Sequence, residues 1–339
     1  MTTDPRQVTL APDAMDAVVQ ERYGSADVFR HQRFPRPDIT DTEVLVRVRA
    51  AGIDRGTWHM MAGRPYLLRV IGFGVRRPKN AVPGVDVAGT VVAVGSSVTR
   101  FQPGDEVFGM SRGSFAEYAA VRADKLAPKP RNLTFAQAAV VPISAGTALQ
   151  ALTDAGRVES GQRVLVIGAS GGVGSYAVQL AKAFGAEVTG VCSTAKVDLV
   201  RSLGADHVID YTRTDITADR IRYDLILDLA GNTSLRRLRR ALTPHGTLVI
   251  VGGEEGGSLT GGFGRSLLAP LLSPFVSQRL TMLASKERGS DQERLTELIE
   301  AGHVTPQVDS TYPLDRVADA MRHLESGAVR GKVAILVAA

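Results

Sequence analysis

A glycine-rich stretch between a short apolar segment and an amphipathic one constrains this chain most. Residues 163–167 read RVLVI, a buried strand, residues 168–174 read GASGGVG, and apolar spacing predicts a helix over Val173–Phe184. Read as A-x-G-x-x-G, the stretch has Ala169 where a first glycine is usual. Gly171 lets a backbone approach a pyrophosphate, and Gly174 lets helix and strand pack closely. Helix N-termini bind phosphate through free N–H groups. The stretch predicts a dinucleotide site with five cofactor-binding residues: Ser170, Gly171, Gly172, Val173 and Gly174.

The segments around this stretch alternate between strand and helix patterns. A helical segment at Thr134–Asp154, interrupted near Pro142, precedes it, and a second helix is expected at Lys196–Leu203. Strands are expected at Glu187–Val191, His207–Asp210, Leu225–Asp228 and Thr247–Val251. Strands that alternate with helices indicate a parallel sheet covered on both faces. We therefore predict a doubly wound Rossmann domain over residues 133–304.

The two ends of the chain have a different pattern. Short strands with Gly and Pro turns predict a β-rich domain over residues 15–132: Met15–Gln20, Glu43–Ala50, Asp86–Val94 and Glu106–Gly109. Near the C-terminus, Thr311–Pro313 and Lys332–Val337 are predicted strands around a helix at Leu314–Glu325. We expect residues 305–339 to return to the first domain. Residues 1–14 are expected to form a flexible arm.

The segment after the second Rossmann strand predicts the cofactor. NAD enzymes usually place an acid there to hold the ribose hydroxyls. Here the segment reads VCSTAK, and the first acid is Asp198. The hydroxyl of Ser193 and the ammonium of Lys196 suit a 2′-phosphate, which favours NADPH. Alternatively, Ser193 caps the following helix.

Composition narrows the class of protein. The chain has 339 residues, 44% of them hydrophobic, and a net charge of +5 from 40 basic and 35 acidic residues. Because both signs are spread along the chain, a mixed surface with sites for anionic phosphates is expected rather than nucleic-acid binding. The basic run Arg236–Arg240 is expected on a solvated helix face, with a nucleic-acid patch as the alternative. The single cysteine, Cys192, excludes an intramolecular disulfide and fits a cytoplasmic location.

Two further segments stand out. Arg64–Asn80 mixes apolar and basic residues, and Gly261–Arg279 is apolar but broken by prolines. We expect both to form a substrate-pocket wall or a subunit interface, with peripheral membrane contact as the alternative. No stretch is long and apolar enough to predict a transmembrane helix, and no secretory signal is visible.

The order of motifs resembles the zinc-independent medium-chain dehydrogenases/reductases, specifically their quinone oxidoreductase group. The resemblance spans residues 15–339. It is carried by the GASGGVG loop and by Tyr23–Val28, Ala50–Asp54, Pro83–Gly89, Pro103–Val107, Gly113–Tyr118, Leu203–Asp206 and Gly331-Lys332. It implies a GroES-like substrate domain, a Rossmann NADP-binding domain, and hydride transfer to quinones, enones or related electrophilic alkenes and carbonyls. We also expect a homodimer.

The resemblance implies roles for further residues. Asp54, where relatives often carry Asn, would lie beside the nicotinamide and either relay protons or cap a turn. Tyr66 would lie over the active site, where its phenol could bond a substrate oxygen; alternatively it is packing. Thr147 would lie near the cofactor or be a helix-start hydroxyl. Lys332 would lie near the cofactor or be a solvated surface lysine. The resemblance also implies that Tyr211 flanks the adenosine phosphate. It implies that three glycines border the nicotinamide: Gly231, Gly252 and Gly253.

Departures from the zinc-dependent relatives predict that no metal is bound. Those enzymes have a Cys after the Ala-Gly segment and Gly-His-Glu where this chain has Gly84-Val85-Asp86. His59 and Asp86 alone do not make a catalytic zinc set, which needs three protein ligands. Two other functions stay open at this point: an enoyl-thioester reductase and a non-enzymatic NADPH-sensing or RNA-binding module.

Overall fold

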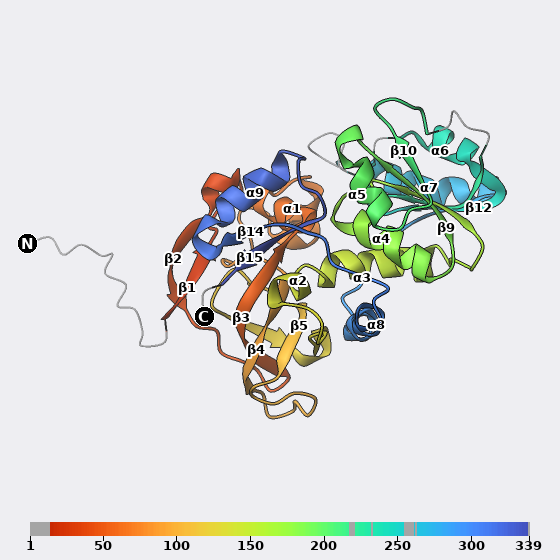
Figure 1. Cartoon of the computed structure of the whole chain (residues 1–339). Coiled ribbons are helices and arrows are strands. Elements are labelled where there is room, and N and C mark those ends of the chain that lie inside the picture. The colour runs from red at the N-terminus through yellow and green to blue at the C-terminus, as the bar shows by residue number, and fades with distance from the viewer. Residues whose placement is uncertain (1–13, 217–220, 232, 254–260, 262, 338–339) are drawn as a thin grey trace, which may run out of the picture.

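The computed structural model describes residues 14–337 except 217–220, 232, 254–260 and 262. Figure 1 shows a β-rich part and a part built on a parallel sheet with helices around it, with α2 and α3 between them. The expected N-terminal arm lies outside the described residues, apart from Ala14, which begins the first strand.

A sheet of seven strands forms the β-rich part. Its order is β14-β15-β3-β4-β5-β7, and β6 pairs with β3. The alternation of EVLVRVRA places Val44, Val46 and Val48 in the core, whereas Arg47 is exposed. Its strands from the first half of the chain are β3 (Glu43–Ile53), β4 (Asp86–Val94), β5 (Glu106–Met110), β6 (Tyr118–Arg122) and β7 (Leu126–Pro128). A separate antiparallel pair, β1 (Ala14–Val19) with β2 (Arg30–Pro35), lies beside it.

The C-terminal segment completes this sheet. β14 (Val308–Pro313) runs parallel to β15 (Lys332–Leu336), and β15 pairs antiparallel with β3. Helix α9 (Val317–Glu325) connects the two strands, and Figure 1 shows all three within the β-rich part. Two strands around a helix were predicted here, although β14 begins earlier than Thr311.

The second sheet has six strands in the order β10-β9-β8-β11-β12-β13, and all neighbours are parallel. This is the doubly wound order, in which strands are added on one side from β8 to β10 and on the other side from β11 to β13, so that the strand order reverses between β8 and β11. Dinucleotides bind at the carboxyl ends of the strands at such a reversal. The strands are β8 (Arg163–Ile167), β9 (Glu187–Cys192), β10 (His207–Asp210), β11 (Tyr223–Asp228), β12 (Leu242–Ile250) and β13 (Arg279–Met282).

Helices α2 and α3 join the two parts. α2 contacts β3 and β4, whereas α3 contacts α4. One hydrophobic core therefore contains Ala50 and Phe108 of the β-rich sheet as well as Val166 of the parallel sheet. The helices are α1 (Arg55–Ala62), α2 (Phe135–Ala138), α3 (Pro142–Gln150), α4 (Gly172–Ala183), α5 (Val197–Ser202), α6 (Leu235–Ala241), α7 (Phe263–Leu272), α8 (Gly289–Glu300) and α9. Within the described part of the chain, no helix has both the length and the apolar character needed to cross a membrane.

Candidate cofactor site and its surroundings

The glycine-rich loop lies between β8 and α4. A methyl group on Gly174 would come 2.1 Å from the carbonyl oxygen of Gly168, so only glycine fits there. Gly171 is the N-cap of α4 and has no side chain to bond the first-turn N–H groups. The N–H groups of Gly172, Val173 and Gly174 are therefore open to an anion. The residues present fit a dinucleotide diphosphate.

Three predicted residues, Ser193, Lys196 and Tyr211, lie near the carboxyl ends of β9 and β10. Ser193 follows β9, and Tyr211, which is exposed, donates its N–H to the carbonyl oxygen of Cys192. The hydroxyl of Ser193 makes no capping hydrogen bond, so the capping alternative is wrong. An acid that the sequence reading missed also lies here, because Asp210 at the end of β10 accepts hydrogen bonds from the hydroxyls of Thr194 and Thr212.

Lys196 connects this corner to the other part of the protein. Its ammonium donates to the carbonyl oxygens of Gly327 and Val329 at 2.8 Å each, in the turn between α9 and β15. Burial lowers the pKa of Lys196. One hydrogen of the ammonium is left for another acceptor, and its contact with a 2′-phosphate stays a prediction.

The carboxyl end of β11 carries a buried ion pair. Asp228 is fully buried and accepts from the N–H of Gly231 at 3.0 Å and from Nη2 of Arg265 on α7 at 2.6 Å. Arg265 also donates to the carbonyl oxygen of Gly231. A methyl group on Gly252 would come 2.3 Å from the carbonyl oxygen of Leu229. The predicted Gly231 and Gly252, with Gly253 after Gly252, therefore border one turn after β11, which Arg265 contacts through Asp228 and Gly231.

Lys332 lies against the glycine-rich loop, since a methyl group on Gly172 would come 3.0 Å from its Cδ. It is 2% exposed, so the alternative of a solvated surface lysine is wrong. Its ammonium donates to Oγ of Ser144 at 2.9 Å and lies 3.4 Å from Oδ2 of Asp86. The N–H of Gly331 donates to the carbonyl oxygen of Ser170. The C-terminal strand thus contacts the predicted cofactor loop directly.

The two predicted catalytic residues have different surroundings. Asp54 is the N-cap of α1: its Oδ1 accepts from the N–H and the hydroxyl of Thr57 at 2.7 and 3.0 Å. Its Oδ2 is buried and has no hydrogen-bond partner among the described residues. Tyr66 is 39% exposed, and the guanidinium of Arg69 lies 4.7 Å from its ring centre. No described group bonds the phenol of Tyr66.

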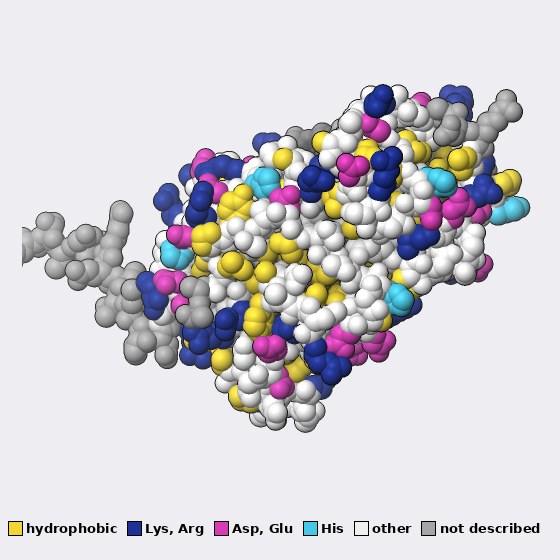
Figure 2. All heavy atoms as spheres, viewed as in Figure 1, with side chains coloured by type: hydrophobic (Ala, Val, Ile, Leu, Met, Phe, Trp, Pro, Cys, Tyr) yellow, Lys and Arg dark blue, Asp and Glu magenta, His cyan; other side chains and the backbone are white. Residues whose placement is uncertain are grey.

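The remaining predictions are placed as follows. Thr147 lies inside α3, which begins at Pro142, so the helix-start alternative is wrong. The segments 64–80 and 261–279 meet, because a methyl group on Gly261 would come 3.1 Å from Cγ of Pro65. On the face shown in Figure 2, basic and acidic side chains are interspersed.

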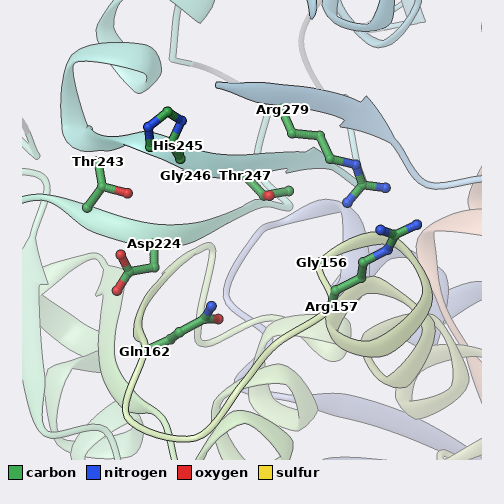
Figure 3. A pocket seen from close by; sticks show the side chains of 9 residues that line it. All are labelled: Gly156, Arg157, Gln162, Asp224, Thr243, His245, Gly246, Thr247 and Arg279. Carbon is green, nitrogen blue, oxygen red and sulfur yellow. The ribbon is translucent and has the colours of Figure 1, made fainter. Parts of the chain in front are cut away.

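A surface depression of about 400 Å³ lies elsewhere on the parallel sheet. Figure 3 shows its lining, with the guanidinium groups of Arg157 and Arg279 side by side. Burial and the charge of Arg157 lower the pKa of Arg279. Because Asp224 and Arg279 lie at the amino ends of β11 and β13, the depression is at the edge opposite the glycine-rich loop.

Known proteins show which family these features define. Residues 40–131 match the alcohol dehydrogenase GroES-like domain, and residues 203–335 match a family described as zinc-binding dehydrogenase. The chain is 34% identical to 2-methylene-furan-3-one reductase of Solanum lycopersicum, over 96% of this chain and 79% of the relative. It is 35% identical to the chloroplastic NADPH-dependent alkenal/one oxidoreductase of Arabidopsis thaliana, over 96% and 80%.

The fold agrees with solved structures. The quinone oxidoreductase from Coxiella burnetii superimposes with a TM-score of 0.84 at 26% identity, covering 96% of this chain and all of that one. The chain belongs to the medium-chain dehydrogenases/reductases, in the group of quinone and alkenal oxidoreductases, and it is an oxidoreductase. One matched family description names zinc, but among the described residues no group of three His, Cys, Asp or Glu side chains is placed to hold a metal.

Proposed function

We propose that this protein is an NADPH-dependent reductase that transfers hydride to quinones, enones or related electrophilic alkenes and carbonyls without zinc. The observation that carries the proposal is the loop at the start of α4, where Gly174 excludes any side chain and no side chain caps the first-turn N–H groups. The Arabidopsis relative, described as an NADPH-dependent alkenal/one oxidoreductase, supports both the cofactor and the substrate class.

NADPH, when bound, supplies the hydride, and the chain supplies binding and orientation. The first turn of α4 would hold the diphosphate, and the buried ammonium of Lys332 adds positive charge beneath that turn. Ser193, Lys196 and Tyr211 would hold the adenosine phosphate. The turn around Gly231, together with Gly252, Gly253 and Thr147, would border the nicotinamide.

The substrate side of the proposal depends on Tyr66 and Asp54. Negative charge develops on the substrate oxygen when hydride adds to an enone or quinone, and a hydrogen-bond donor stabilises that charge. The phenol of Tyr66 is a donor without a described partner, and the nearby guanidinium of Arg69 favours negative charge at this place. Oδ2 of Asp54 is the carboxylate oxygen that the cap does not use, so it is the atom of this residue left to contact a bound substrate or cofactor.

Replacing Tyr66 by phenylalanine is expected to lower kcat by about tenfold without abolishing turnover. The loss of one donor costs up to about 10³-fold in preorganised sites, and water can replace a phenol that is 39% exposed. Steady-state kinetics on a quinone and an enone measure the effect. Tyr118→Phe on β6 is the matched control, since Arg36 stacks on that ring at 4.3 Å. Unchanged kcat on all substrates would assign Tyr66 to packing, and weaker NADPH binding would assign it to the cofactor.

The proposed function is tested by binding and turnover assays on the unmodified protein. NADPH is expected to bind much more tightly than NADH, and NADPH oxidation is expected with quinones or enones. Prior dialysis against a chelator should leave this turnover unchanged. Equal affinities for NADH and NADPH would contradict the cofactor choice, and activity restored only by zinc would contradict the metal-free mechanism. Turnover confined to crotonyl thioesters would favour the enoyl-thioester reductase.

We also propose a homodimer, a small-molecule substrate, no nucleic-acid partner and a cytoplasmic location. Support for the dimer comes from β13, which is the last strand of its sheet, and from the exposed Leu268, Leu271 and Phe275 beside it. A monomer in analytical ultracentrifugation would contradict it. The relatives from plants include chloroplastic proteins, so location needs its own measurement by fractionation of the native cell.

A further inference from the structure

A buried polar cluster connects three distant segments of the chain. Asp86 on β4, Ser144 on α3 and Lys332 on β15 are 0%, 1% and 2% exposed. The ammonium of Lys332 lies between the hydroxyl of Ser144 and Oδ2 of Asp86, and Oδ1 of Asp86 accepts from the N–H of Ile143 at 2.9 Å. All of these contacts lie out of reach of bulk water, so charges here are weakly screened.

The ionisable groups around Asp86 are few. Lys332 faces it from β15, Asp54 from the start of α1, and Tyr176 from α4, where the phenol donates to the carbonyl oxygen of Val140. Burial raises the pKa of Asp86 to about 7; the charge of Asp54 adds to this rise, and Lys332 opposes it. Lys332 is therefore the cation that opposes burial at Asp86, and with a pKa of about 7 the carboxyl of Asp86 is about half protonated at pH 7.

The same cluster adjoins the predicted phosphate site. A methyl group on Gly172, the first residue of α4, would come 3.0 Å from Cδ of Lys332 and 3.3 Å from Oγ of Ser144. The N–H of Gly331 donates a hydrogen bond to the carbonyl oxygen of Ser170 in the glycine-rich loop. The stem of Lys332 thus passes directly beneath the turn whose N–H groups would hold a diphosphate.

We propose that Asp86 takes up a proton when the diphosphate of the dinucleotide binds at the first turn of α4. The inference rests on the proposed cofactor site. The diphosphate competes with Asp86 for the ammonium of Lys332 and adds negative charge on the other side of it. Asp86 is buried, so water cannot solvate its charge when the attraction of Lys332 weakens. Protonating the carboxyl therefore costs less free energy than leaving it charged. The proton comes from solvent and is placed on Oδ2, since Oδ1 stays bound to the N–H of Ile143.

The direction of the pH dependence follows from this linkage. The pKa of Asp86 is about 7 before binding and is higher in the complex, so binding favours the protonated carboxyl. Affinity is therefore full below pH 7 and falls as the pH rises from 7 toward the pKa of the complex. If the pKa rises by one unit, affinity falls by about tenfold in total between pH values well below 7 and well above 8, and about threefold of this fall occurs between pH 7 and 8.

The test measures dinucleotide affinity between pH 6.5 and 9 by nicotinamide fluorescence, and proton exchange by calorimetry in two buffers of different ionisation heat. NADH is the main probe because it carries the diphosphate but lacks the 2′-phosphate, which would itself titrate or shift Lys196. For the wild type, with a pKa one unit higher in the complex, we expect affinity to fall by about fivefold from pH 7 to 9, with uptake of about half a proton at pH 7.5. For Asp86→Asn we expect a change below about twofold and no uptake.

The calorimetric count on the wild type does not depend on whether Asp86→Asn folds. Net proton exchange of zero with NADH would overturn the inference, and so would an Asp86→Asn protein that keeps the wild-type slope. If Asp86→Asn lowers the melting temperature but the dependence of NADH affinity on pH persists, Asp86 contributes to stability and is not the group that takes up the proton. If neither NADH nor NADPH binds at any pH, the proposed cofactor site fails as well. Binding with a flat pH profile would overturn this inference alone.

Discussion

Replacing Arg265 by alanine is expected to lower the free energy of unfolding by about 3–5 kcal/mol. The variant leaves Asp228, which is 0% exposed, without its cation at the carboxyl end of β11. The intact pair contributes little net stability, because the attraction between the two charges is offset by their loss of solvation. Removing Arg265 leaves a buried charge with neither water nor a partner, and this loss destabilises the fold. Denaturant unfolding followed by circular dichroism measures the difference.

Two control variants test whether the loss of stability comes from the unpaired charge of Asp228. Arg265→Ala combined with Asp228→Asn should be less destabilised than Arg265→Ala alone, because the buried charge is gone. Arg201→Ala removes an exposed pair with Asp198 and should leave stability almost unchanged. Equal loss in the single and double variants would show that Arg265 acts through packing and through its bond to Gly231.

A methyl group at Gly171 is expected to weaken NADPH binding by about 100-fold or more while the protein stays folded, since it would stand where the pyrophosphate must approach. Alanine is compatible with the backbone here, because Gly171 has φ −84° and ψ 179°. The nearest atom to the added methyl carbon is the carbonyl oxygen of Gly168 at 3.4 Å. Dissociation constants from fluorescence titration, together with the melting temperature, separate the two effects.

Gly174→Ala is the matched comparison within the same loop. Its methyl group would overlap the carbonyl oxygen of Gly168 at 2.1 Å, so the helix must shift away from the strand. We expect a loss of about 1–3 kcal/mol of stability, as for other overpacked sites. If Gly171→Ala bound NADPH as well as wild type, the diphosphate would not approach this loop, and the proposed cofactor site would be wrong.

The sequence alone predicted the features that local patterns encode. RVLVI followed by GASGGVG specified β8, the loop and α4, because a strand–turn–helix junction with close backbone contacts needs glycine at defined steps. The period-two alternation at residues 43–50 specified β3, and the same reasoning predicted the two strands and the helix near the C-terminus. The roles of Tyr66, Asp54 and Tyr211 came from the resemblance, whereas those of Ser193 and Lys196 came from the segment after the second Rossmann strand, and all of them stay predictions.

The tertiary structure decided the contacts between distant segments. Asp86 and Lys332 are 246 residues apart, and nothing local to either one predicts that they meet in the core. The same holds for Arg265 with Asp228 and for Lys196 with the turn at Gly327, since each contact depends on how two separately folded elements pack. The sequence predicted the strand that ends in Asp228, but neither the burial of this acid nor its partner. Short-range periodicity sets which face of an element is buried, whereas the pairing of charges inside the core is set by the packing of whole sheets and helices.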